Sequence, residues 1–135
     1  MAQNLRILFV DDYETVRILF HRYLTDLGIE CIVEAENGKT ALQKIQAAHA
    51  AKQPFDLIFC DWNMPVMNGL ELLHALRKDP NFNRLPFVMV TANSDESEVV
   101  EAMRAGVSEY LVKPFDTKSL GRTIQRVIER YKTVA

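Results

Sequence analysis

Five residues that could do chemistry stand at the ends of apolar runs in the sequence. Asp11 and Asp12 follow one run, Asp61 closes a second, and Thr91 and Lys113 close two more. Mg²⁺ takes oxygen ligands, and a carboxylate beside it can attack phosphorus to form an acyl phosphate. Phosphoryl transfer also needs the charge on the transferred oxygens to be neutralised, which a lysine amine and a hydroxyl can help to do. The residue types therefore predict that Asp61 accepts a phosphoryl group beside a metal held by Asp11 and Asp12.

Each of these residues also has a structural explanation that needs no ligand. Asp11 and Glu14 fit a capping box for a first helix, and Asp61 fits an Asx-turn before a Met-Pro pair. Thr91 can cap a loop or a helix, and Lys113 can simply be solvated. Three carboxylates at one edge, however, repel one another unless a cation, protonation or outward-facing rotamers relieve the repulsion. Their combination favours the metal-dependent site.

Histidine and cysteine residues do not suggest a different metal. His21, His49 and His74 fall on or near three separate predicted helices, so their spacing does not suit zinc. Cys31 and Cys60 lie in strand-like apolar runs, which predicts buried free thiols in a reducing cytoplasm. The oxygen-only set of candidate ligands therefore indicates Mg²⁺ as the cofactor.

Five short apolar runs, rich in β-branched and aromatic side chains, are predicted to be the strands that position the reactive residues. They cover residues 5–10, 30–35, 55–60, 86–90 and 108–112. Apolar residues recur at spacings of three and four after each run, which predicts five amphipathic helices. The apolar positions of these helices span residues 16–27, 41–48, 70–76, 99–105 and 120–131. Strict alternation predicts one doubly wound α/β domain over residues 1–135, a parallel sheet between two layers of helices.

The carboxyl ends of parallel strands are where open α/β sheets bind ligands. The first, third, fourth and fifth predicted strands all end in or next to a candidate residue, whereas the second does not. Four strand ends therefore bring three carboxylates, a hydroxyl and an amine to one rim.

The composition excludes several other functions. A net charge of −2 and a pI of 5.9 give no argument for nucleic-acid binding. No run approaches the ~18 apolar residues of a membrane span, and Asp11 interrupts an amino terminus too short in apolar residues for a signal peptide. We therefore expect a cytoplasmic monomer with no membrane or nucleic-acid partner.

Four motifs together resemble the receiver domain of response regulators over essentially the whole chain: FVDDYE, CDWNMPVMNG, MVTAN and EYLVKPF. The resemblance is strongest to the stand-alone, CheY-like chemotaxis regulators of that family, because of DWNMP, GLELL and VKPF with no appended domain. It implies a flavodoxin-like (βα)₅ sandwich with strand order 2-1-3-4-5. That order comes from the family alone, whose chemotaxis member is a standard example of it.

The resemblance also implies a role for each matched residue. Asp61 takes the place of the phosphoacceptor, and Asp11 and Asp12 take the places of the metal-binding pair. The main-chain carbonyl of Asn63 matches a further metal ligand. The hydroxyl and the amine at the rim match the phosphate-binding groups of the family.

A switch is implied at two of these positions. Thr91 and Tyr110 match the pair in which phosphorylation draws the hydroxyl inward and the aromatic ring follows. The Lys113–Pro114 peptide bond matches one that is usually cis in the family. Asn93 matches a variable position that influences the lifetime of the phosphate.

The implied function is a phosphorylation-activated switch of a two-component system that catalyses only its own phosphorylation and dephosphorylation. Its partners would be a phospho-histidine sensor kinase of the chemotaxis type and the flagellar motor switch. The output face would consist of the fourth helix, the fifth strand with Tyr110, and a basic stripe on the last helix. The stripe comprises Lys118, Arg122, Arg126 and Arg130. A solvated helix face is the simpler explanation of that stripe. The alternatives are a phosphorelay intermediate that exchanges phosphate with a histidine phosphotransfer protein, and a non-phosphorylated receiver-like scaffold.

Two other families share the architecture but not the motifs. A flavodoxin needs a Ser/Thr/Gly-rich phosphate loop after the first strand, where this chain has DDYE. A phosphatase of the haloacid dehalogenase type has its nucleophile there in a DxD pattern. This chain instead has adjacent aspartates and no room for a substrate cap.

Overall fold

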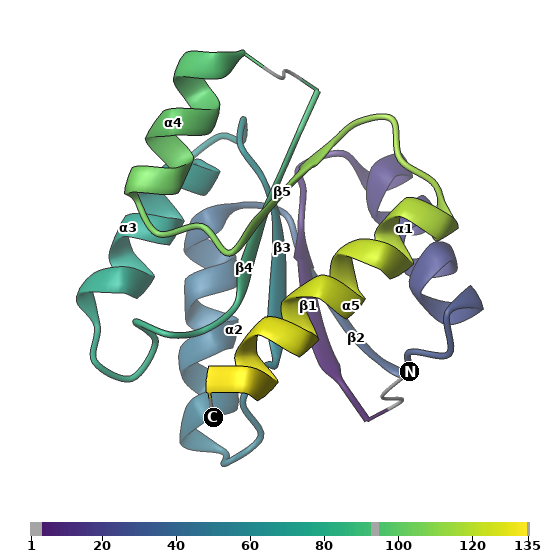
Figure 1. Cartoon of the computed structure of the whole chain (residues 1–135). Coiled ribbons are helices and arrows are strands. Elements are labelled where there is room, and N and C mark those ends of the chain that lie inside the picture. Colours follow the sequence, from purple (N-terminus) through teal and green to yellow (C-terminus); the bar gives the residue numbers. More distant parts are fainter. Residues whose placement is uncertain (1–3, 93–94, 135) are drawn as a thin grey trace.

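Five parallel strands form the sheet that the alternating pattern predicts (Figure 1). The computed structural model describes residues 4–92 and 95–134. The strand order is β2-β1-β3-β4-β5, which confirms the flavodoxin-like order implied by the resemblance. The strands are β1 (Arg6–Val10), β2 (Cys31–Ala35), β3 (Leu57–Asp61), β4 (Phe87–Thr91) and β5 (Glu109–Val112). Their bounds lie within two residues of the predicted runs.

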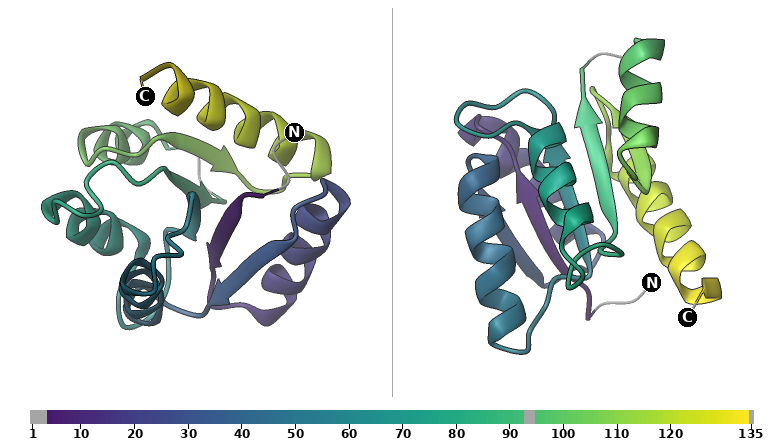
Figure 2. Two further views of the ribbon diagram at one scale, coloured as in Figure 1. Left: turned by 90° about the horizontal axis from the view of Figure 1, so that it is seen from below. Right: turned by 90° about the vertical axis from the view of Figure 1, so that its left-hand side faces the viewer.

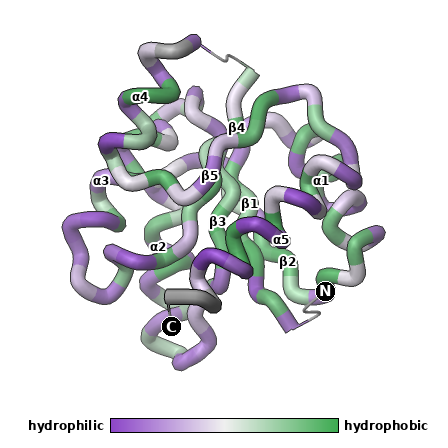
Figure 3. The backbone as a smooth tube through the Cα atoms, in the orientation of Figure 1, coloured by the Kyte–Doolittle hydropathy of each residue, from purple (hydrophilic) through white to green (hydrophobic). Residues whose placement is uncertain are grey.

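Two layers of helices cover the sheet (Figure 2). The helices are α1 (Glu14–Asp26), α2 (Gly38–Ala50), α3 (Gly69–Lys78), α4 (Glu96–Arg104) and α5 (Thr117–Val134). Helices α1 and α5 pack on one face, while α2, α3 and α4 pack on the other. Because both faces are covered, the central strands are almost continuously buried and apolar, as Figure 3 shows by their hydropathy.

Aromatic rings pack helix α1 onto the two strands whose carboxyl ends carry Asp11 and Asp61. Phe20 of α1 stacks on Phe9 of β1 with ring centroids 3.7 Å apart, and it meets Phe59 of β3 at 4.9 Å. Burying one such side chain stabilises the fold by about 2–3 kcal/mol. Phe9 and Phe59 each precede a candidate aspartate, Asp11 or Asp61, by two residues, so this packing holds both strand ends in place.

Helix α3 begins against the end of β3 because residue 69 has no side chain. A methyl group on Gly69 would lie 2.4 Å from the main-chain oxygen of Asp61. The Gly69 amide donates a hydrogen bond to the Trp62 carbonyl at 2.9 Å. Asn68 and Glu71 form a reciprocal capping box at the same point. The start of α3 therefore fixes the backbone around Asp61.

The structure corrects one prediction about the cysteines. Cys60 is buried, but Cys31 is only half-buried, because β2 is an edge strand; both are free thiols. Within residues 4–92 and 95–134, no helix is long and apolar enough to cross a membrane.

Candidate functional site

The carboxyl ends of four strands meet at one rim of the sheet, as predicted. Asp61 and Thr91 are the last residues of β3 and β4, Asp11 follows β1 directly, and Lys113 follows β5. Only 0%, 6% and 1% of the surfaces of Asp11, Asp61 and Thr91 are exposed. Polar groups buried to this degree need partners.

Asp11, Asp12 and Asp61 form an acidic cluster at this rim. Each offers a carboxylate oxygen that lies within 4.8 Å of those of the other two. The Oδ1 atom of Asp12 is buried and has no hydrogen-bond partner among the described residues. An orphaned oxygen in an oxygen-only donor set is what a hard divalent cation such as Mg²⁺ satisfies. The residues present therefore fit Mg²⁺.

Lys113 brings a single positive charge to the cluster. Its Nζ atom lies 3.1 Å from Asp11 Oδ2 and 3.4 Å from Asp61 Oδ1. Burial opposes the charged ammonium, but the two carboxylates outweigh burial and raise the pKa of Lys113. The Lys113 amide also donates to the Thr91 carbonyl at 2.7 Å, and the Lys113–Pro114 peptide is cis. One ammonium cannot balance three carboxylates, so the rim retains excess negative charge.

Asp61 is harder to ionise than an exposed aspartate. Burial raises its pKa most, Lys113 lowers it and Asp11 raises it again, and the result is a pKa of about 6. A second cation at the cluster would favour the ionised form, which is the nucleophile. Metal binding and the reactivity of Asp61 are therefore coupled by this geometry.

A cavity of about 540 Å³ opens above the rim. Its lining includes Asp12, Asp61, Asn63 and Lys113, which brings together residues that the sequence placed at three strand ends. The other lining residues are Tyr13, Met64, Pro65, Asn68 and Ala92. The cavity has room for a phosphoryl group and the waters that Mg²⁺ retains.

The start of α1 differs from the capping box considered for Asp11 and Glu14. The N-cap residue is Tyr13, which makes no side-chain capping bond, and Asp11 Oδ1 instead accepts from the Tyr13 amide at 2.9 Å. Arg17, which the sequence did not single out, donates to the Asp11 carbonyl at 2.6 Å and lies 3.4 Å from Glu34. Because Arg17 lies in the second turn of the helix that follows Asp11, its position in the sequence could have indicated this contact.

Tyr110 and Thr91 are in contact in this structure. Burial and the charge of Glu98 raise the pKa of Tyr110, while a hydrogen bond with the Thr91 side chain opposes that shift. Tyr110 is half-buried on β5 beside α4. Asn93, named above for phosphate lifetime, lies outside the described residues.

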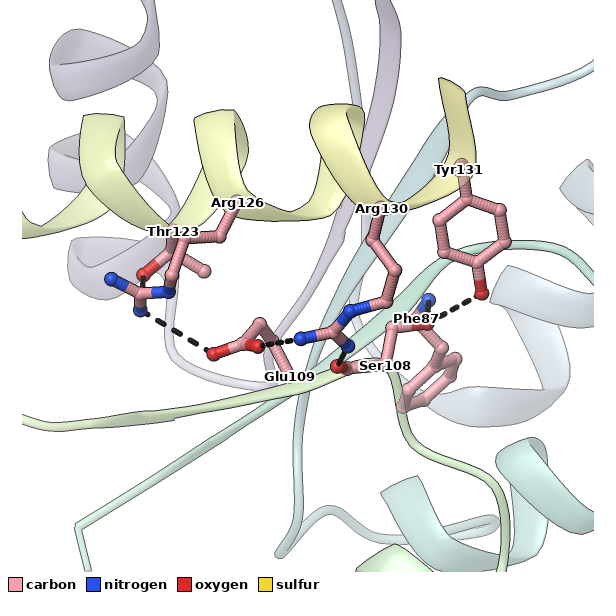
Figure 4. Close-up of polar contacts among 7 residues, drawn as sticks. All are labelled: Phe87, Ser108, Glu109, Thr123, Arg126, Arg130 and Tyr131. Atoms are coloured by element: carbon pink, nitrogen blue, oxygen red, sulfur yellow. Dashed lines mark hydrogen bonds and ion pairs between the residues drawn. The ribbon is translucent and has the colours of Figure 1, made fainter. Parts of the chain in front are cut away.

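The basic stripe on α5 is partly neutralised by β5. Arg126 and Arg130 both pair with Glu109, at 3.4 Å and 2.7 Å (Figure 4). Lys118 and Arg122 are exposed. Half of the predicted stripe is therefore engaged within the protein, and Lys118 and Arg122 are its more accessible cations.

Comparison with known proteins identifies the family. The response regulator receiver domain matches residues 7–125. The chain belongs to the response-regulator receiver family. Chemotaxis protein CheY of Pseudomonas aeruginosa is 40% identical over 126 residues, which cover 93% of this receiver and 98% of that protein. A structure of chemotaxis protein CheY4 of Vibrio cholerae matches with a TM-score of 0.82 and 35% identity, covering 92% of this receiver and 98% of that chain.

A third similar structure concerns the metal. The receiver domain of a Pseudomonas aeruginosa sensor histidine kinase, with a magnesium ion coordinated in its active-site cleft, matches with a TM-score of 0.79 and 28% identity. The match covers 93% of this receiver and 98% of that chain. The receiver described here is thus a CheY-like response regulator of two-component signalling, related to chemotaxis proteins. Receivers of this kind are signalling switches, and they bind Mg²⁺ at an acidic pocket.

Proposed function

We propose that the chain is a single receiver domain over residues 1–135 that acts as a phosphorylation-activated switch in the cytoplasm. Asp61 accepts a phosphoryl group from a phospho-histidine of a sensor kinase of the chemotaxis type. One observation carries this proposal. The Asp61 carboxylate borders an open cavity, shares the Lys113 ammonium with Asp11, and belongs to a cluster of three carboxylates within 4.8 Å.

Each residue of the rim has a distinct role in the phosphoryl transfer. An oxygen of Asp61 forms the new bond to phosphorus as the N–P bond of the phospho-histidine breaks, and the leaving imidazole keeps that electron pair. Lys113 Nζ and the Thr91 hydroxyl neutralise and bind the phosphoryl oxygens. Asp11, Asp12, Asp61 and the main-chain carbonyl of Asn63 would hold Mg²⁺, which would supply the remaining neutralisation. That a similar receiver domain coordinates a magnesium ion in its active-site cleft supports a metal site of this kind.

Intact-mass spectrometry with acetyl phosphate tests the acceptor. One phosphoryl group is expected in the presence of Mg²⁺ and none after chelation. Asp61→Asn should abolish labelling, whereas Asp26→Asn, an exposed aspartate of α1, should label normally. Equal labelling of wild type and Asp61→Asn would reject Asp61 as the acceptor, and no labelling of wild type would favour a non-phosphorylated scaffold.

Phosphorylation is proposed to move Thr91 and Tyr110. A phosphoryl oxygen competes with Tyr110 for the Thr91 hydroxyl, so Tyr110 shifts and changes the face formed by α4, β5 and α5. The two states are populations of one equilibrium, which phosphorylation biases. NMR shifts of Tyr110 should therefore differ between free and beryllofluoride-bound protein, and identical shifts would exclude the switch.

The output is proposed to be the flagellar motor switch, because the similar proteins include chemotaxis proteins named CheY. Lys118 and Arg122 suit an acidic partner segment, and their charge mainly raises the rate of association. Arg122→Glu should weaken binding to the switch protein while Asp61 labelling stays normal. If deletion in a motile host leaves swimming reversals intact and a histidine phosphotransfer protein drains the phosphate rapidly, the protein is a phosphorelay intermediate instead.

A further inference from the structure

A second cavity, of about 390 Å³, lies at the opposite edge of the sheet from Asp61. It is bounded by the end of α3, the loop before β4, the turn before β5 and the end of α5. Its lining residues are Arg77, Asn83, Arg84, Gly106, Arg130 and Tyr131, which we call the Arg77 pocket. Three of these lining residues are arginines, and none of them is an aspartate or a glutamate. Its volume is within the range of small-molecule sites.

Arg77 is held in place by neutral groups only. Its guanidinium donates to the carbonyls of Gly106 at 2.9 Å, Phe82 at 3.2 Å and Leu85 at 2.8 Å. It is half-buried, and burial lowers the pKa of Arg77. Among the described residues no carboxylate forms an ion pair with it. The carbonyls fix the orientation of this guanidinium but leave its positive charge without a counterion.

Of the other two arginines of the pocket, Arg130 has a carboxylate partner and Arg84 has none among the described residues. Arg130 pairs with Glu109 at 2.7 Å and also donates to the Ser108 carbonyl (Figure 4). Arg84 is exposed and has no ion pair with any of the described residues. The pocket is therefore lined by two arginines, Arg77 and Arg84, whose charges form no ion pair within the part of the chain that the structure describes.

Besides the arginines, Asn83 and Gly106, the pocket is lined by the ring of Tyr131. Tyr131 bonds through its hydroxyl to Ser108 Oγ at 2.8 Å, and Ser108 Oγ also accepts from the Phe87 amide at 3.0 Å (Figure 4). These bonds anchor the Tyr131 ring between α5 and the start of β5. The ring and the aliphatic parts of the arginines offer flat, apolar surface next to the two unmatched charges, and guanidinium groups also stack on planar rings.

We propose that the Arg77 pocket binds a phosphate monoester that carries a flat aromatic ring, as the nucleoside monophosphates do. Two unmatched guanidinium groups favour a dianion over a monoanion, and a phosphate monoester carries about −1.5 to −2 charges at pH 7. Arginine binds phosphate through paired, charge-assisted hydrogen bonds. This site is separate from the Asp61 rim, and it uses none of the residues assigned to phosphoryl transfer.

An NMR titration of the ¹⁵N-labelled full chain tests the proposal. Adenosine monophosphate, inorganic phosphate and adenosine are added in turn, with chelator present so that no metal draws phosphate to the Asp61 rim. The nucleotide should shift the amides of Arg84, Gly106 and Tyr131 in a saturable way. Inorganic phosphate and adenosine should each bind at least about tenfold more weakly than the nucleotide, because each supplies only half of the interaction.

A matched pair of charge reversals separates the pocket from general electrostatics. Arg84→Glu should weaken nucleotide binding by about tenfold or more, whereas Arg22→Glu, the same change on the exposed face of α1, should alter it by less than about twofold. Phosphorylation of Asp61 by acetyl phosphate should remain normal in both variants. The proposal is wrong if no saturable shift appears, if the shifts centre on Asp61, if the two variants behave alike, or if an acidic peptide without phosphate binds the pocket more tightly.

Discussion

Opposite edges of one sheet carry opposite excess charge, and the two edges are built differently. At the carboxyl edge, three carboxylates face the single ammonium of Lys113, and two of them, those of Asp11 and Asp61, are almost fully buried. At the amino edge, Arg77 is held by loops and helix ends through carbonyl groups, and its surroundings are half-exposed. Excess charge should therefore cost more stability at the Asp61 rim, which depends on an added cation, than in the Arg77 pocket, which water can reach.

Removing the ammonium from the rim is expected to have the largest effect. Lys113→Met should lower the free energy of unfolding by about 3 kcal/mol without Mg²⁺, because the buried carboxylates of Asp11 and Asp61 lose their cation. Added Mg²⁺ should recover part of that loss by binding the folded state. Urea unfolding measures both quantities. Lys39→Met, at an exposed position of α2, should change little, and an equal loss in the two variants would break the comparison.

Removing one negative charge from the rim should stabilise the protein, with a definite pH dependence. The pKa of Asp61 is about 6 when folded, against about 4 when unfolded, so the folded state binds the extra proton between these values. Stability from this group is therefore present below about pH 4 and is lost as pH rises through about 6. Asp61→Asn should raise the free energy of unfolding by about 2 kcal/mol near pH 7.5 in chelator and by almost nothing near pH 4. A gain that does not change between these two pH values would contradict the assigned cause.

At the amino edge, removing the charge of Arg77 should lower the free energy of unfolding by less than removing that of Lys113. Arg77→Met keeps the apolar stem but removes the guanidinium donor from the Gly106 and Leu85 carbonyls, which should cost about 1–2 kcal/mol. The Phe82 carbonyl still accepts a hydrogen bond from the Leu85 amide at 3.1 Å. The loss should not depend on Mg²⁺, in contrast to that of Lys113→Met. Thermal unfolding with and without Mg²⁺ compares the two variants, and Arg22→Met serves as the control. A loss as large as that of Lys113→Met would mean that the two edges are equally sensitive.

The smallest effect is expected where charge is already balanced near the surface. Glu109→Gln breaks the ion pairs with Arg126 and Arg130, and exposed pairs contribute less than about 1 kcal/mol. The loss should shrink further in high salt, because salt screens exposed charges. Urea unfolding at low and high ionic strength measures this. A loss that high salt leaves unchanged would show that hydrogen bonding, and not charge, dominates at Glu109.

The sequence predicted the rim well because parallel strands place their last residues together. Asp11, Asp61, Thr91 and Lys113 needed only correct strand ends to be brought to one edge. The Arg77 pocket and the Glu109 pairs were not predicted, because they depend on how loops and helix ends pack across distant parts of the chain.

Gly121 illustrates the same limit. A glycine inside a helix costs about 1 kcal/mol relative to alanine, and no residue pattern within α5 accounts for a glycine at position 121. In the structure, a methyl group there would lie 3.1 Å from the side chain of Leu27, the residue that caps the end of α1, so the glycine allows α5 to pack closely on that end. The requirement for glycine at this position depends on the distance between two helices, and the residue pattern along one helix does not reveal that distance.

The contact between Gly69 and the Asp61 carbonyl limits how this protein can evolve. A methyl group 2.4 Å from that oxygen and 2.9 Å from the Met89 sulfur has no space, because one neighbour is main chain. Any larger residue would have to push α3 away from β3, and so displace the backbone of the reactive aspartate. Glycine is thus the single amino acid compatible with this backbone at position 69, and a lineage that lost it would have to rebuild the junction of β3 and α3 before it regained a correctly placed acceptor.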